Sequence, residues 1–215
     1  MTTASSLRER KKQRTRQALI DAALDLFGEH GFGRVTLDEV CAEVEVSKRT
    51  FFRYFRGKED VAMAPLEDLW RVFLEELENG PADGRPLLGL MESTLLTALD
   101  RVADEEWASR ALASYRLLQG TPSMDAHGLH FCESTMRSVL AVLHRRLDLP
   151  DDARPRLAGD MMVAAWRHAL DDWAATAAGP PAASGLAARF RDAMAALPGS
   201  LTLTASPRPE ADAAR

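Results

Sequence analysis

Three consecutive side chains, Lys48, Arg49 and Thr50, are the strongest candidates for recognition chemistry in this 215-residue chain. Ser47 directly precedes them and is a good N-cap residue, so the three would crowd the first turn of a short helix ending near Phe55. Arg and Lys donate hydrogen bonds to the acceptor atoms of guanine, and Thr offers a hydroxyl and a methyl group. The pattern predicts a helix whose first residues contact base edges in the major groove of DNA.

Two side chains further along the chain are placed to hold the DNA backbone. Tyr54 and Lys58 can reach phosphates, and Lys58 also opens the next helix, whose free amide groups attract anions. The alternative interpretation is an ordinary surface helix that carries solvated basic residues. Both interpretations remain open on these residues alone.

A second group of chemically capable side chains lies within nine residues and comprises Asp125, His127, His130, Cys132 and Glu133. On a helix the two histidines share a face, and Glu133 continues that face one turn later, so the group could hold a metal. The metalloprotease pattern HExxH is absent, Gly128 weakens a helix, and no nucleophile stands beside an obvious base. We therefore predict neither catalysis nor a metal site. A metal- or redox-responsive regulator stays open as an alternative.

The elements around Lys48 have the pattern of a helix-turn-helix. A short helix is predicted by a stripe of apolar residues at helical spacing, which comprises Leu37, Val40, Cys41 and Val44. Thr36 precedes the stripe and Glu39 follows three residues later, which is the spacing of a capping box. The connection Glu45-Val46-Ser47 leads to the second helix, which would pack inward through Phe51 and Phe55. Two short helices joined by a tight turn present the second one to DNA.

A longer helix with a basic beginning is predicted before this motif. Residues 1–16 carry six basic residues and one acidic residue, an apolar stripe then runs from Leu19 to Phe27, and Gly31 is a suitable C-cap. Residues 1–60 carry 12 Lys and Arg against 10 Asp and Glu, whereas the rest carries 15 against 22. A mildly basic head on an acidic body fits a DNA reader joined to a module with another task. We expect residues 1–7 to be disordered.

Residues 31–59 resemble the N-terminal domain of the tetracycline-repressor (TetR) family of bacterial transcription regulators. The resemblance rests on Gly31-Phe32, Thr36, Val46-Ser47, Lys58-Glu59 and the run Thr-Phe-Phe-Arg-Tyr-Phe over residues 50–55. Two positions depart from the family pattern. Glu45 stands where the family often has Gly, and a left-handed backbone there would cost about 1 kcal/mol. Phe52 replaces a common Tyr and lacks the hydroxyl that could reach a phosphate.

The resemblance implies a DNA-binding regulator that works as a homodimer and responds to a small molecule. The most direct expectation is a repressor that a largely apolar effector releases from a double-stranded operator, and residues 50–61 also look similar to a branch that senses fatty acyl-CoA. A DNA-binding protein without a small-molecule ligand is the alternative. The DNA-contacting residues expected on this basis are Thr36, Ser47, Lys48, Arg49, Thr50, Phe52, Tyr54 and Lys58.

The rest of the chain reads as helices, so the predicted fold class is all-α. We expect a DNA-binding domain over residues 1–57, a helical ligand-binding and dimerisation domain over 58–198, and a disordered tail over 199–215. Helices are predicted over 58–78, 86–103, 104–119, 122–147, 151–178 and 183–197, separated by Gly- and Pro-containing turns. Pro65 should kink the helix that joins the two domains.

Large apolar side chains in the body are the candidates for an effector pocket, which is implied by the resemblance. Taken singly, each of them is as suited to fill a core. The predicted pocket residues are Trp70, Phe73, Met91, Trp107, Tyr115, Phe131 and Trp166.

The last two helices carry broad apolar stripes rich in alanine, which suits close helix packing between two subunits. Members of the TetR family pair through these two helices, and a two-fold axis would place two recognition helices on successive major-groove faces. The alternative is that both stripes close the core of one subunit. The predicted dimer contacts are Met162, Trp166, Ala169, Trp173 and Phe190.

The overall composition is that of a globular protein, with 46% hydrophobic and 27% charged residues and a net charge of −5. The cysteines Cys41 and Cys132 imply no disulfide framework, and the N-terminus lacks the apolar segment of a signal peptide. No uncharged apolar run is long enough to cross a bilayer. We therefore expect a cytoplasmic protein with no cofactor and no membrane partner.

Overall fold

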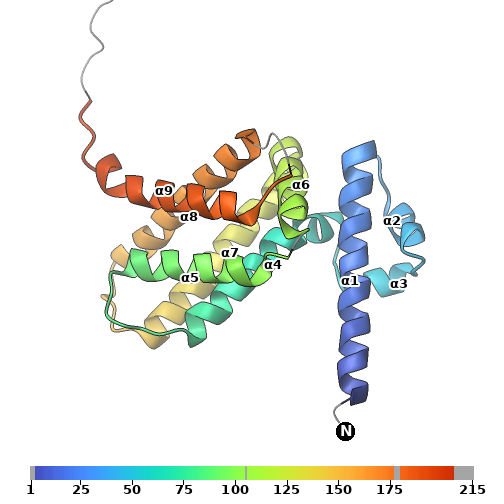
Figure 1. Cartoon of the computed structure of the whole chain (residues 1–215), viewed down its shortest axis with the longest axis horizontal. Helices are drawn as coiled ribbons and strands as arrows, with labels where there is room; N and C mark the ends of the chain where they lie inside the picture. The colour runs from blue at the N-terminus through green and yellow to red at the C-terminus, as the bar shows by residue number, and fades with distance from the viewer. Residues whose placement is uncertain (1–2, 105, 177–179, 206–215) are drawn as a thin grey trace, which may run out of the picture.

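The computed structural model describes residues 3–104, 106–176 and 180–205, and the regular elements in these ranges are all helices. They are α1 (Thr3–His30), α2 (Leu37–Glu43), α3 (Lys48–Phe51), α4 (Lys58–Asn79), α5 (Leu87–Val102), α6 (Trp107–Gly120), α7 (Pro122–Arg146), α8 (Arg154–Thr176) and α9 (Ala183–Ser200). The predicted all-α class is confirmed. In Figure 1, α1 to α3 stand at one side, α4 leads away from them, and α5 to α9 form the body.

The helix-turn-helix forms because its local capping signals agree with its apolar stripe. The backbone N–H of Glu39 donates to Thr36 Oγ1 (3.3 Å), and the N–H of Thr36 donates to Glu39 Oε2 (2.7 Å). The predicted capping box is therefore present, and the hydrogen bonds that the backbone N–H and hydroxyl of Thr36 donate to the Glu39 carboxylate lower its pKa. Ser47 caps α3 by accepting from the N–H of Thr50 (3.2 Å). Glu45 has φ of 54°, the left-handed conformation that a glycine would adopt more easily.

The end of α3 and the start of α1 differ from the predicted boundaries. The helix α3 ends at Phe51, because the N–H groups of Arg53 and Tyr54 bond three residues back and tighten the chain into turns. The helix α1 begins at Thr3, so the expected disorder of residues 1–7 is wrong for 3–7; the run from Thr3 to Phe27 contains neither Gly nor Pro. Residues 1–2 lie outside the described residues.

The last helix also extends past residue 199, where the tail was predicted to begin. Helix α9 continues through Pro198 to Ser200, since a proline in the last turn removes only one helical hydrogen bond. Residues 206–215 lie outside the described part of the chain. The predicted domain division coincides with the start of α4 at Lys58, and it stays a prediction.

The helix α4 connects the head to the body and contains Pro65, as expected. It packs against α5, α6 and α7 in the body and against α1 in the head, and α1 also contacts α6 directly. The indole N–H of Trp107, at the start of α6, donates to the carbonyl oxygen of Pro65 (3.2 Å). The start of α6 therefore contacts the head–body connection at its proline.

Within the described residues, we find no helix with both the length and the apolar character that a bilayer crossing requires.

Candidate nucleic-acid interface and effector core

The three predicted base-reading residues lie together on the outward face of α3. Lys48 and Arg49 are exposed and Thr50 is half-buried, while Phe51 beside them is fully buried and anchors the helix. The Lys48 ammonium lies 3.0 Å from the carboxylate of Asp38 on α2, with the Lys48 side chain still 53% exposed. An exposed ion pair of this kind contributes little stability, so little free energy is lost when Lys48 leaves Asp38 to contact another group.

A basic hollow beside α3 adds residues that the predicted set lacks. It has a volume of about 580 Å³ and lies between the first turns of α1 and the end of the helix-turn-helix. Its lining comprises Arg8, Glu9, Lys11, Lys12, Thr15, Thr50, Arg53 and Tyr54. The signal in the sequence is the basic run at the start of α1. Only the folded chain brings it next to Thr50 and Arg53.

Lys58 is engaged inside the head in this structure. Its ammonium group donates to the carbonyl oxygens of Phe32 (2.6 Å) and Val35 (2.8 Å) and lies 4.7 Å from the centre of the Phe32 ring. The side chain therefore points into the head, because the loop before α2 offers it two acceptors and an aromatic face. Lys58 thus ties the first turn of α4 to that loop in this structure, and its phosphate contact stays a prediction.

Two further ion pairs fasten the head to the body. Arg16 on α1 forms a bidentate pair with Asp68 on α4 (2.6 and 3.0 Å), and its guanidinium lies 5.3 Å from the centre of the Phe55 ring. Arg110 on α6 lies 3.6 Å from Asp21 on α1, with only 11% of the Arg110 side chain exposed. The orientation of α1 is thus set by both α4 and α6.

Comparison with known proteins bears on this arrangement. The sequence profile described as "Bacterial regulatory proteins, tetR family" matches residues 19–64, which span the second half of α1, the helix-turn-helix and the start of α4. The transcriptional regulator TcmR of Streptomyces glaucescens is 36% identical over 173 residues, which are 78% of this chain and 76% of TcmR. This chain belongs to the tetR family of bacterial regulatory proteins. The family consists of transcriptional regulators and not of enzymes.

Other relatives are more distant from this tetR-family chain. The regulator RutR of Escherichia coli K12 is 31% identical over 115 residues, 54% of this chain and 53% of RutR. Among solved structures, the SmeT–triclosan complex has a TM-score of 0.54 at 21% identity and covers 92% of this chain and all of SmeT. Thermus thermophilus FadR, in complex with lauroyl-CoA, has a TM-score of 0.52 at 22% identity and covers 91% of this chain. These two structures share the fold.

The predicted pocket residues are brought together in the body, where they pack against one another. Trp70, Phe73, Met91, Trp107, Tyr115 and Trp166 are all at least 92% buried and belong to one core. The ring of Trp70 stands edge-on to those of Phe73 (5.3 Å between centres) and Trp166 (6.2 Å). In this structure the six side chains therefore fill the core of the body. The seventh, Phe131, is half-buried and lines a hollow between α7 and the head.

The predicted dimer residues are buried within the single chain. Met162, Trp166, Ala169, Trp173 and Phe190 are each at most 3% exposed, which fits the alternative that the stripes close the subunit core, and their contact with a second subunit stays a prediction. The ring centres of Trp166 and Phe190 lie 5.6 Å apart, edge to face, between α8 and α9. The two helices pack on each other through these stripes and turn other residues outward.

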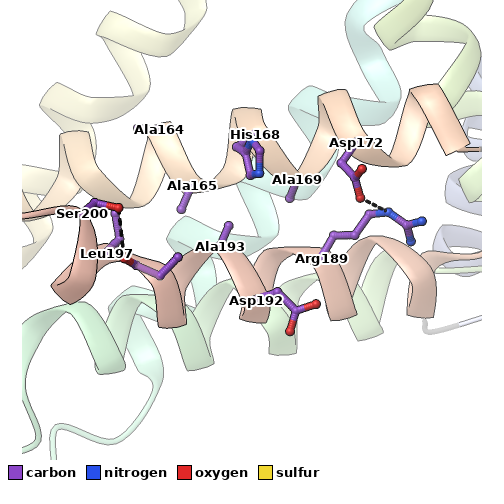
Figure 2. A pocket seen from close by; sticks show the side chains of 11 residues that line it. Ala164, Ala165, His168, Ala169, Asp172, Arg189, Asp192, Ala193, Leu197 and Ser200 are labelled. Carbon is purple, nitrogen blue, oxygen red and sulfur yellow. Dashed lines mark hydrogen bonds and ion pairs between the residues drawn. The ribbon is translucent and has the colours of Figure 1, made fainter. Parts of the chain in front are cut away.

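The outward side of α8 and α9 forms a groove of about 430 Å³ (Figure 2). It is lined by Ala164, Ala165, His168, Ala169, Asp172, Arg189, Asp192, Ala193, Ala196, Leu197 and Ser200. Figure 2 shows small alanine side chains along its floor and the pair Asp172–Arg189 (2.6 Å) at one end. The alanine-rich stripes of the sequence anticipate this groove in part, since Ala169 belongs both to the predicted dimer contacts and to the groove lining.

The cluster that invited a metal-site interpretation is divided between two faces of α7. His127 Nε2 lies 3.0 Å from Glu67 on α4, whereas Glu133 pairs with Arg156 on α8 (3.0 Å). Within the described ranges, His, Cys, Asp and Glu side chains nowhere converge in a group of three that could hold a metal ion. Burial, with the Asp38 charge adding to it, raises the pKa of the Cys41 thiol, which disfavours a reactive thiolate there.

Proposed function

We propose that this chain is a cytoplasmic repressor that binds a double-stranded operator as a homodimer and leaves it when a largely apolar small molecule binds the body. The observation that carries the proposal is the exposed first turn of α3, with Lys48 and Arg49 outward and Phe51 buried, in a chain of the tetR family. A recognition helix needs this combination of a fixed inner face and a polar outer face.

The DNA contacts divide into two kinds. Lys48, Arg49 and Thr50 read base edges, while Thr36, Ser47, Phe52 and Tyr54 stand around them at the backbone. The basic start of α1, which faces the same hollow, adds phosphate contacts that fade with rising salt. Because the whole chain has a net charge of −5, this local basic surface supplies the attraction for DNA.

The second subunit packs on the groove between α8 and α9. Its alanine floor permits the close approach of helices, and its rim carries His168, Asp192 and Arg189 as polar contacts. A two-fold axis through this groove makes the same patch meet itself and sets the distance between the two recognition helices.

The effector separates the aromatic residues that fill the body. Trp70 on α4, Trp107 on α6 and Trp166 on α8 come from three helices, so a ligand inserted between them moves these helices relative to one another. The Trp107–Pro65 hydrogen bond supports α4 as the receiver of that movement. The triclosan and lauroyl-CoA named with the two structural neighbours support an apolar ligand class. A tenfold loss of operator affinity takes about 1.4 kcal/mol of coupling.

The test is operator release by a panel of apolar compounds. A labelled operator, selected from DNA around the gene, is bound by purified protein and titrated with triclosan, lauroyl-CoA and related compounds while anisotropy is followed. Release by at least one compound, with sedimentation showing a dimer throughout, is expected. Specific, dimeric binding that no compound weakens would leave a DNA-binding protein without an effector and would refute the proposed response.

A further inference from the structure

His127 on α7 joins the body to the segment that follows the recognition helix. Its Nε2 atom lies 3.0 Å from Glu67 Oε1 and 3.7 Å from Asp60 Oδ1, both on α4. The other oxygen of Asp60 accepts a hydrogen bond from the backbone N–H of Arg56 (2.8 Å), one residue after Phe55 of the helix-turn-helix. The Asp60 carboxylate thus lies between the His127 imidazole and the backbone of the head.

The same turn of α7 packs tightly against α6. Gly128 directly follows His127, and a Cβ atom at Gly128 would lie 2.7 Å from Leu118 Cδ1 on α6. No larger residue fits there unless Leu118 moves. A displacement of α6, which carries Trp107 and Tyr115, therefore pushes on the turn that holds His127.

The two ends of α7 are attached to α4 by different chemistry. At the far end, Arg145 pairs with Glu78, and Arg146 donates to the carbonyl oxygens of Leu77 and Gly80. Arginine keeps its charge at every physiological pH. At the head end the attachment is a histidine, the side-chain type whose charge changes between pH 5 and 8. Helix α7 is thus attached to α4 by arginine side chains at one end and by a histidine side chain at the other.

We propose that His127 is a positioning residue that couples the effector-binding body to the DNA-binding head, and that its charge sets how much effector is needed for operator release. The proposal rests on the proposed function. The single N–H on Nε2 can donate to Glu67 in either protonation state, whereas only a charged imidazolium also attracts the Asp60 carboxylate 3.7 Å away. The charged form therefore holds α7 on α4 more firmly and resists the movement that the effector requires.

The surroundings of His127 favour this role. The charged and titratable groups around it are Asp60 and Glu67 on α4, Arg53 and Arg56 from the segment after α3, and His130 on α7 itself. Burial raises the pKa of the Glu67 carboxyl, and its hydrogen bond with His127 acts in the opposite direction. A partly buried carboxylate gains most from a cation beside it, and His127 is the group within hydrogen-bond distance.

The experiment compares the wild type with His127→Gln and with the matched control His130→Gln, which alters the other histidine of the same hollow. Glutamine keeps a donor toward Glu67 and cannot be charged. Operator release by triclosan and by lauroyl-CoA is titrated at about pH 6 and about pH 8, the two sides of the histidine range. In the wild type and in His130→Gln, half-release should need at least about threefold more compound at the lower pH; in His127→Gln the two values should agree.

A second measurement separates this inference from the proposed function. With no ligand present, the wild type should have a higher Tm than His127→Gln. This difference in Tm should be larger at the lower pH than at the higher pH by at least about 2 °C. A gap in Tm that does not depend on pH overturns the inference, whether or not an effector is found. A pH-dependent gap with no release of the wild type by any compound refutes the proposed response alone. Release that stays pH-dependent in His127→Gln also overturns the inference.

Discussion

Replacing Lys58 with methionine distinguishes its inward role from a phosphate contact. Methionine keeps the apolar stem and removes the ammonium group that donates to Phe32 and Val35. Losing a hydrogen bond from a charged donor costs roughly 1.5–3 kcal/mol of stability when the acceptor is left without a partner. Because the site is half-buried and water can reach part of it, we expect a total loss of about 2–4 kcal/mol in the free energy of unfolding.

The assay is thermal unfolding combined with operator binding over a range of salt. A loss of that size lowers Tm by at least about 4 °C in a chain of this length. Operator affinity should fall together with stability, and the slope of log affinity against log salt should stay unchanged, since no phosphate contact is lost. The matched control is Arg49→Ala on the exposed face of α3, which should keep the wild-type Tm and cost about 1–3 kcal/mol of operator binding.

The opposite result for Lys58→Met would refute this reasoning. A wild-type Tm together with a salt slope reduced by about one unit would show that Lys58 leaves the carbonyl groups and grips a phosphate in the complex.

Three further predictions test the packing, the turn and the subunit contact. Trp173→Ala should destabilise the fold by about 3–5 kcal/mol without yielding a folded monomer, because the indole is 97% buried within one chain; denaturant unfolding and sedimentation check this. Glu45→Gly should raise the free energy of unfolding by about 1 kcal/mol, since φ is 54° there, and an unchanged midpoint in urea would argue against strain at this turn. Ala196→Arg, in the groove between α8 and α9, should leave the Tm of the subunit nearly unchanged and convert the dimer to monomer in sedimentation; a dimer that persists would place the subunit contact elsewhere.

The helix-turn-helix could be predicted closely because its determinants are local. The capping box joins Thr36 to a residue three positions away, and Ser47 caps the helix that begins beside it. The strained turn at Glu45 was also predictable, since the resemblance marks that position as one where glycine is common. Such signals depend on neighbours in the chain, so the sequence contains them completely.

Three assignments depended on partners that lie far away in the sequence. Helical periodicity shows that Trp173 belongs to a buried face, and it is silent on whether the same chain or a second copy covers that face. Lys58 has a flexible stem, so its direction depends on acceptors supplied 23 and 26 residues earlier. His127 meets Glu67 across 60 residues, and its sequence neighbours Asp125 and Glu133 suggested a metal cluster instead.

The sequence by itself thus determined the family, the all-helical class and the exposed basic face of α3, since these follow from short-range capping, periodicity and motif spacing. The tertiary structure alone decided which way the long polar side chains point and which helix faces remain outward. A side chain with several rotatable bonds takes its direction from the groups that the fold brings within hydrogen-bond distance.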